Sequence, residues 1–124
     1  MTFYILIFQV VYYWMECHHD YHVIESSDPR EKDHNGQWHK WSAAHAVAMN
    51  LVIAWLAGNW WILFTGLSIR LLLLQIVLNH LRGINPSYLG SGPVDSFCRI
   101  YFGLTGTIVV KFILLAGFIT LALL

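Results

Sequence analysis

Apolar side chains occupy four long runs of the chain, and shorter polar segments separate them. A helix needs roughly 20 mainly apolar residues to cross the hydrocarbon core of a membrane. The pattern therefore predicts an all-α integral membrane protein, a small bundle of four transmembrane helices in a single domain over residues 1–124. The predicted spans are residues 2–20, 41–57, 60–81 and 97–124. Gly58 and Asn59 form the predicted turn between the second and third spans, because such residues interrupt helices.

The composition agrees with a surface that meets lipid. Hydrophobic residues make up 57% of the chain and charged residues only 11%, whereas soluble domains carry about a quarter charged residues. Basic and acidic residues are balanced at seven each, which argues against a nucleic-acid partner. No basic residue precedes the first apolar run and no small-residue cleavage site follows it, so we expect this segment to be retained as a helix.

The polar residues are distributed asymmetrically across the predicted bundle. Four spans place the two polar connections, residues 21–40 and 82–96, on the same membrane face. All seven acidic residues and all seven histidines lie in these connections or at the ends of spans that meet them. The opposite face has only the turn at Gly58 and the two termini. The sequence therefore predicts one crowded, histidine-rich polar face.

The basic residues predict the orientation of the bundle. Those that flank the crowded face are Arg30, Lys32, Lys40, Arg82 and Arg99. Lysine and arginine are enriched in cytoplasmic connections. We therefore expect the crowded face in the cytoplasm, both termini outside, and a bacterial-type inner membrane.

The segment WMECHHDYH, residues 14–22, ends the first apolar run. Residues 2–15 alone are too few to cross a membrane, so the helix is predicted to continue through Glu16, His19 and Asp20. Spacings of three and four place these three side chains on one helix face. A carboxylate that faces lipid costs several kcal/mol, and this face should therefore turn toward the other helices.

Glu16 and His19 form a Glu-x-x-His pair, which predicts a metal site. The pair resembles the half-motif of carboxylate-bridged di-iron and di-manganese bundles, because one helical turn brings an anionic oxygen and an imidazole nitrogen together. The chain has one copy where those bundles have two, so the resemblance is local. The predicted ligands are Glu16, His19, Asp20, His45, Asp28 and His39. The residues predicted to surround the ligands or contact a substrate are Arg70, Asn79, His80, Arg82 and Asp95.

The donor set is compatible with zinc, iron or manganese. Oxygen donors favour manganese, whereas additional imidazole donors favour zinc or iron. Haem b is a less favoured alternative in which His45 and His80 are the axial ligands, since no further haem signature accompanies them.

Two cations, Arg70 and Lys111, fall within predicted spans and require partners. Counting helix rise places Arg70 close enough in depth to Glu16 for an ion pair, which is the alternative to a metal at Glu16. Lys111 has no carboxylate at its depth. We expect it either to extend to the interface or to meet an acid of another subunit.

The leading functional hypothesis is a membrane metal-binding protein, extended to a metal-dependent enzyme that acts on a lipid-like substrate. The sequence assigns no catalytic residue. A second hypothesis is a non-catalytic accessory or structural subunit of a larger membrane assembly. A third is proton or ion transfer along the polar helix faces, and the simplest alternative is a solvated polar surface. The expected partners are the lipid bilayer, other membrane subunits and further copies of the chain.

Overall fold

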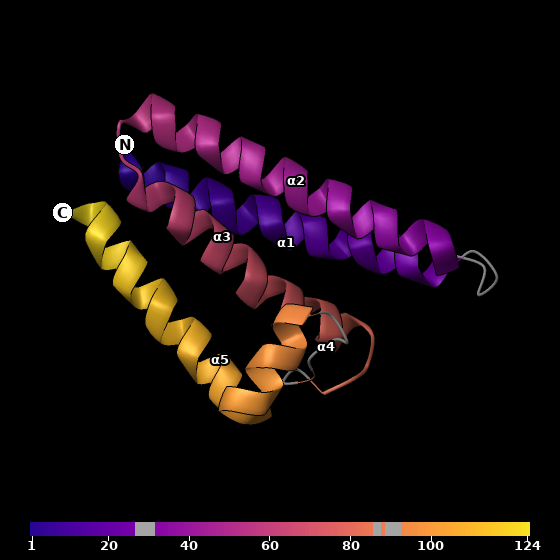
Figure 1. The fold of residues 1–124 in the computed structure, drawn as a ribbon. Coiled ribbons are helices and arrows are strands. Elements are labelled where there is room, and N and C mark those ends of the chain that lie inside the picture. Colours follow the sequence, from indigo (N-terminus) through magenta and orange to yellow (C-terminus); the bar gives the residue numbers. More distant parts are fainter. Residues whose placement is uncertain (27–31, 86–87, 89–92) are drawn as a thin grey trace.

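The structure, a computed structural model, describes residues 1–26, 32–85, 88 and 93–124, apart from the side chains of residues 26, 32–39 and 93–95. Most of the described residues are helical, and there is no strand among them. The elements are α1 (Thr2–Ser26), α2 (Lys32–Ala57), α3 (Trp61–Leu73), η2 (Leu74–Leu78), α4 (Asn79–Leu81) and α5 (Pro93–Leu123) (Figure 1). Because α3, η2 and α4 follow one another without a break, they form one long helix. The predicted all-α architecture of four long helices is confirmed.

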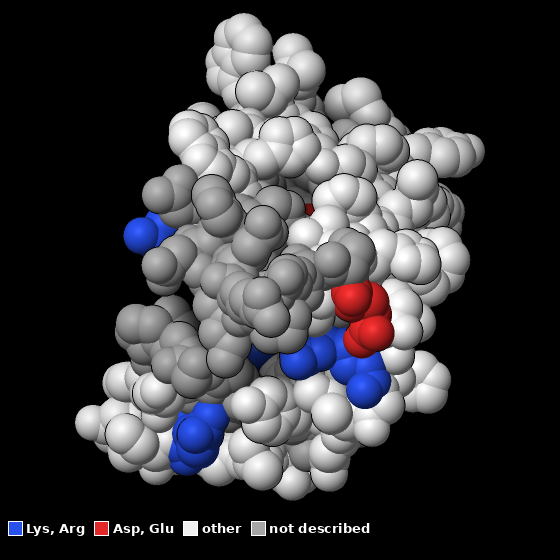
Figure 2. Space-filling model, turned by 90° about the vertical axis from the view of Figure 1, so that its right-hand side faces the viewer, with Lys and Arg blue, Asp and Glu red and all other residues white. Residues whose placement is uncertain are grey.

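The two ends of the molecule differ in what they carry. Both termini and the turn between α2 and α3 lie at one end, whereas the last turns of α1, the first turns of α2 and α4 lie toward the other, which we call the connection end (Figure 1). The described residues at the connection end include exposed acidic and basic side chains (Figure 2). They are Glu25, Lys40, Arg82 and Arg99. The long helix that begins with α3 is central, since α3 packs against α1, α2 and α5.

Two helical stretches in the described part of the chain are long and apolar enough to cross a membrane. They are Trp61–Leu81, which comprises α3, η2 and α4, and Ser96–Leu123 within α5. The first two predicted spans, in α1 and α2, do not meet this criterion. Both helices carry polar side chains along their length, such as Gln9 in α1 and Asn50 in α2.

The predicted span 97–124 is not one straight helix, because α5 contains a break at Gly103. This residue has φ 65° and ψ −177°, a backbone conformation that glycine adopts readily. The Thr107 hydroxyl has one proton to share between the carbonyl oxygens of Gly103 at 2.6 Å and Cys98 at 3.3 Å, and it so provides a donor for acceptors near the break. The two parts of α5 meet at a sharp angle (Figure 1). The part after the break, residues 104–123, is about 30 Å long.

A buried amide layer connects α1, α2 and α3. Gln9, Tyr13 and Asn50 are each 0% exposed. The Gln9 side-chain amide donates to Asn50 Oδ1 at 2.8 Å and to the Ile62 carbonyl oxygen at 3.2 Å. The Asn50 amide donates to the Tyr13 hydroxyl and to the Ala46 carbonyl oxygen. Hydrogen bonds of this kind specify which helix faces meet, because a buried polar group without a partner is costly.

Gly66 of α3 allows this layer to form. A Cβ atom at this buried position would overlap the Asn50 amide oxygen and the Gln9 amide nitrogen. The missing side chain therefore lets α3 approach the two amides closely. Two apolar clusters pack on either side of the layer, and their buried members are Tyr13, Ala46 and Ile69 in one cluster and Ala54, Ile62 and Ala122 in the other.

Substituting Gly66 by alanine should destabilise the bundle by about 1–3 kcal/mol, the usual range for overpacking a well-packed interior. The measurement is the free energy of unfolding of the detergent-solubilised protein, followed by circular dichroism. Gly117→Ala is the matched control, because a Cβ atom at Gly117 meets nothing within 4 Å. Equal stability of the two variants would show that α3 does not approach the amides as described.

Candidate functional site

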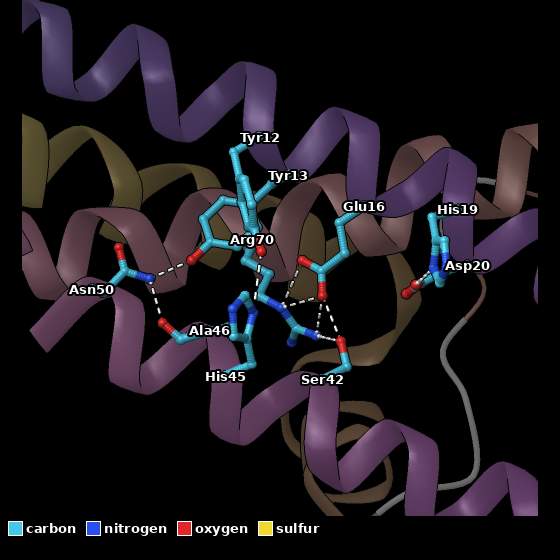
Figure 3. Close-up of polar contacts among 10 residues, drawn as sticks. All are labelled: Tyr12, Tyr13, Glu16, His19, Asp20, Ser42, His45, Ala46, Asn50 and Arg70. Atoms are coloured by element: carbon cyan, nitrogen blue, oxygen red, sulfur yellow. Dashed lines mark hydrogen bonds and ion pairs between the residues drawn. The ribbon is translucent and has the colours of Figure 1, made fainter. Parts of the chain in front are cut away.

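An ion pair between α1 and α3 lies at the centre of the site (Figure 3). Arg70 Nη2 donates to Glu16 Oε1 at 2.8 Å, and Arg70 Nε donates to Glu16 Oε2 at 3.1 Å. Ser42 of α2 completes the contact, since its hydroxyl donates to Glu16 Oε1 at 2.5 Å and accepts from Arg70 Nη2 at 2.8 Å. Each of the three helices therefore supplies one member of this triad of Glu16, Ser42 and Arg70.

The triad is largely shielded from solvent. The side chains of Arg70 and Glu16 are 11% and 13% exposed. A guanidinium that binds both oxygens of a carboxylate forms a strong and directional contact. The ion pair expected from helix rise is thus present, and Glu16 has a charge partner within the chain.

An open cavity of about 480 Å³ adjoins the triad between α1 and α2. Its polar lining residues are Glu16, His19, Asp20, Ser42 and His45. Its apolar lining is formed by Tyr12, Met15 and Trp41. We call this space the polar cavity. Four of the six residues predicted as metal ligands line it, namely Glu16, His19, Asp20 and His45. The first three share one face of α1, and the antiparallel helix α2 brings His45 opposite that face.

Two imidazoles and a second carboxylate complete the polar cavity. Asp20 is 2% exposed, and its Oδ1 atom lies 3.6 Å from His19 Nδ1. The His19 side chain is 69% exposed. On the opposite wall, the Tyr12 hydroxyl and His45 Nδ1 are 3.1 Å apart and share a hydrogen bond whose direction depends on the imidazole tautomer.

The described residues do not support the predicted metal centre. Among them, no group of three histidine, cysteine, aspartate or glutamate side chains is arranged to hold a metal ion. Asp28, a further predicted ligand, lies outside the described residues, and His39 lies in α2 with an undescribed side chain. The cavity-lining residues contact one another in pairs, His19 with Asp20 and His45 with Tyr12.

Of the residues predicted to surround the metal ligands, Arg70 contacts Glu16 beside the polar cavity, whereas Asn79, His80 and Arg82 do not line it. The Asn79 side-chain amide donates to the Tyr88 carbonyl oxygen at 2.8 Å, and it therefore holds the connection that follows α4. His80 and Arg82 are exposed at the same end of this helix. Asp95 lies in α5, and its side chain is not described. The haem alternative gains no support, because His80 does not line the cavity that contains His45.

Lys111, the second cation within a predicted span, has a partner inside the chain. Its Nζ atom donates to Gln75 Oε1 at 2.6 Å, and this contact joins α5 to η2. Gln75 lies in η2, the π-helical turn within the long helix. The helix is wound differently in this turn, which changes the direction of its side chains. The sequence analysis expected Lys111 to extend to the interface or to meet an acid of another subunit, and it did not predict this contact with Gln75.

Comparisons with known protein families, curated proteins and solved structures found no match to this chain.

Replacing one member of the ion pair should destabilise the protein by about 3 kcal/mol, because the other member is left as an unpaired buried charge. The variants are Glu16→Gln, Arg70→Gln and the double variant, compared by their free energies of unfolding in detergent. The double variant should lose less stability than the sum of the two single variants, which measures the coupling between them.

Arg82→Gln is the control, because Arg82 is exposed and its replacement should change the stability by less than about 0.5 kcal/mol. Additive losses in the double variant would contradict a direct contact between Glu16 and Arg70.

Proposed function

We propose that the chain is an integral membrane protein of four spans that binds a small amphipathic ligand in the polar cavity between α1 and α2. The observation that carries the proposal is the composition of this cavity, in which apolar walls converge on a few fixed polar groups. Ligand sites in proteins commonly have this character. The proposal concerns binding, and it involves no chemical step.

The size of the cavity agrees with a ligand site. Its volume of about 480 Å³ lies within the roughly 300–1,000 Å³ typical of small-molecule pockets. Glu16 and Ser42 are held in place by Arg70, and Asp20 is held beside His19. Polar groups that are already positioned favour binding, because little conformational entropy is lost when the ligand arrives.

The exposed surface supports a location in the membrane. Large apolar side chains are exposed on each long helix, for example Phe3, Leu56, Leu71 and Ile113 at 62%, 70%, 49% and 64%. Soluble monomers rarely expose large continuous apolar areas. Since two stretches meet the length and apolarity expected of a span, a lipid environment explains this surface more simply than water does.

The position of the polar cavity suits an amphipathic molecule. Most of its lining residues lie in the halves of α1 and α2 nearer the connection end, where exposed charged side chains occur (Figures 1 and 2). Trp41 lines the cavity and is 74% exposed, and tryptophan is enriched at membrane interfaces. A ligand that enters from the bilayer would place its polar head in this region.

Filling the cavity should remove the ligand without unfolding the bundle. Met15 lines the cavity and is 60% exposed. The bundle should therefore tolerate the larger side chain of Met15→Trp, which should occupy part of the cavity. Mass spectrometry of protein purified in a mild detergent should detect a near-stoichiometric amphipathic molecule on the wild type and much less on this variant.

The matched control is Leu56→Trp, because Leu56 is exposed on α2 and does not line the polar cavity. This variant should retain the ligand. Absence of any bound amphiphile from the wild type, or equal amounts on wild type and Met15→Trp, would contradict the proposal.

Labelling of single cysteines tests the four spans and their orientation. Cys17 and Cys98 are free thiols, and both would first be replaced by alanine. Lys40→Cys should then react with a membrane-impermeant maleimide only from the cytoplasmic side, and Trp60→Cys, in the turn between α2 and α3, only from the opposite side. Reaction of both cysteines from the same side would rule out α2 as a span, whereas exchanged sides would reverse the orientation.

A further inference from the structure

A second, apolar hollow lies on the same pair of helices as the polar cavity. Its volume is about 290 Å³. It is lined by Met1, Tyr4, Ile5 and Phe8 on the first helix and by Ile53 on α2. These side chains are mainly apolar and none of them is ionised at neutral pH, so the hollow favours an apolar group away from the Met1 amino group. We call this space the tail hollow.

The two spaces follow one another along α1 and α2. Phe8 lines the tail hollow and Tyr12 lines the polar cavity. These residues are one turn apart on α1, and their rings are stacked with centroids 6.0 Å apart. On α2, Ile53 and His45 face the corresponding spaces about 12 Å apart along the helix axis. A flexible chain that leaves the polar cavity over the two rings therefore reaches the tail hollow.

The charges of the polar cavity select the head group. The described residues that line it include two carboxylates, Glu16 and Asp20, and no lysine or arginine. The charge of Glu16 is balanced by Arg70, whose guanidinium donates to Glu16 and Ser42. Within the described part of the chain, the ion-pair contact of Asp20 is with His19, whose Nδ1 atom lies 3.6 Å from Asp20 Oδ1. Glu16, Asp20 and Arg70 therefore give the described part of the cavity a net negative charge, which favours a cation and repels an anion.

The aromatic side chains of the cavity have the same preference. Tyr12 and Trp41 contribute ring surfaces to the lining, and aromatic faces attract ammonium groups. A carboxylate or phosphate head would instead meet Asp20, and the lining residues that the structure describes include no lysine or arginine to offset this repulsion.

We propose that the ligand is a single-chain amphiphile with a cationic head, an amine or quaternary ammonium group. The head lies in the polar cavity near Asp20, and the hydrocarbon tail passes Phe8 and Tyr12 into the tail hollow. This inference rests on the proposed function, because it specifies the chemistry of the ligand that occupies the polar cavity.

The test compares three probes that share a dodecyl tail and differ in the head group. They are dodecyltrimethylammonium, a dodecyl glycol ether and dodecanoate, each titrated onto the full chain in lipid nanodiscs, with empty nanodiscs as background. The cationic probe should bind most tightly. Asp20→Asn should weaken it about tenfold, which corresponds to about 1.4 kcal/mol, and should leave the glycol ether unchanged.

Asp20→Glu keeps the charge and should retain most of the preference for the cation, which separates an electrostatic effect from misfolding. Equal binding of the three head groups would overturn the cationic head and leave the proposed function intact. Failure of all three probes to bind above background would overturn the proposed function itself.

The position of the tail is tested separately with Phe8→Ala, because Phe8 is 51% exposed and its loss should not unfold the bundle. This variant should bind dodecyltrimethylammonium several-fold more weakly and should bind butyltrimethylammonium as the wild type does. An unchanged affinity for the dodecyl probe would show that the tail does not enter the tail hollow.

Discussion

The contact between Glu16 and Arg70 is the constraint on which the rest of the arrangement depends. It unites opposite charges that are mostly withdrawn from solvent, and Ser42 joins it from a third helix. A buried ion pair adds little net stability compared with apolar packing, but loss of either partner is strongly unfavourable. The pair therefore acts mainly by excluding other rotations and shifts of α1, α2 and α3. Because Glu16 and Ser42 also line the polar cavity, the same contact determines the shape of the proposed binding site.

A second layer of contacts defines the other half of these three helices. The amides of Gln9 and Asn50 meet where Gly66 leaves space for them, so the sequence of α3 determines how closely the helices approach. The final helix is attached by different contacts, Lys111 to Gln75 and the Asn59 amide to the Ala122 carbonyl oxygen. The polar cavity and the tail hollow belong to α1 and α2, and α5 does not line either of them.

The sequence predicted features that depend on helix periodicity and rise. The four helices, the shared face of Glu16, His19 and Asp20, and the depth match between Glu16 and Arg70 follow from these regular quantities. Contacts that depend on how each helix rotates about its axis were not predicted, as Ser42 in the triad shows. The break at Gly103 was also missed, since glycine within an apolar run is tolerated in a straight helix as well. The metal hypothesis requires donors from the first two spans to converge, which depends on how these helices rotate, and the described residues contain no group of three such donors.

The most direct test of the account is a distance measurement by solid-state nuclear magnetic resonance on the protein in lipid bilayers. Dipolar coupling between ¹⁵N in arginine guanidinium groups and ¹³C in glutamate carboxyl groups reports their separation. The contact of 2.8 Å between Arg70 Nη2 and Glu16 Oε1 predicts a strong coupling in the wild type that disappears in Arg70→Gln. A wild-type spectrum without that coupling, or with a coupling that persists in Arg70→Gln, would contradict the central role of this ion pair.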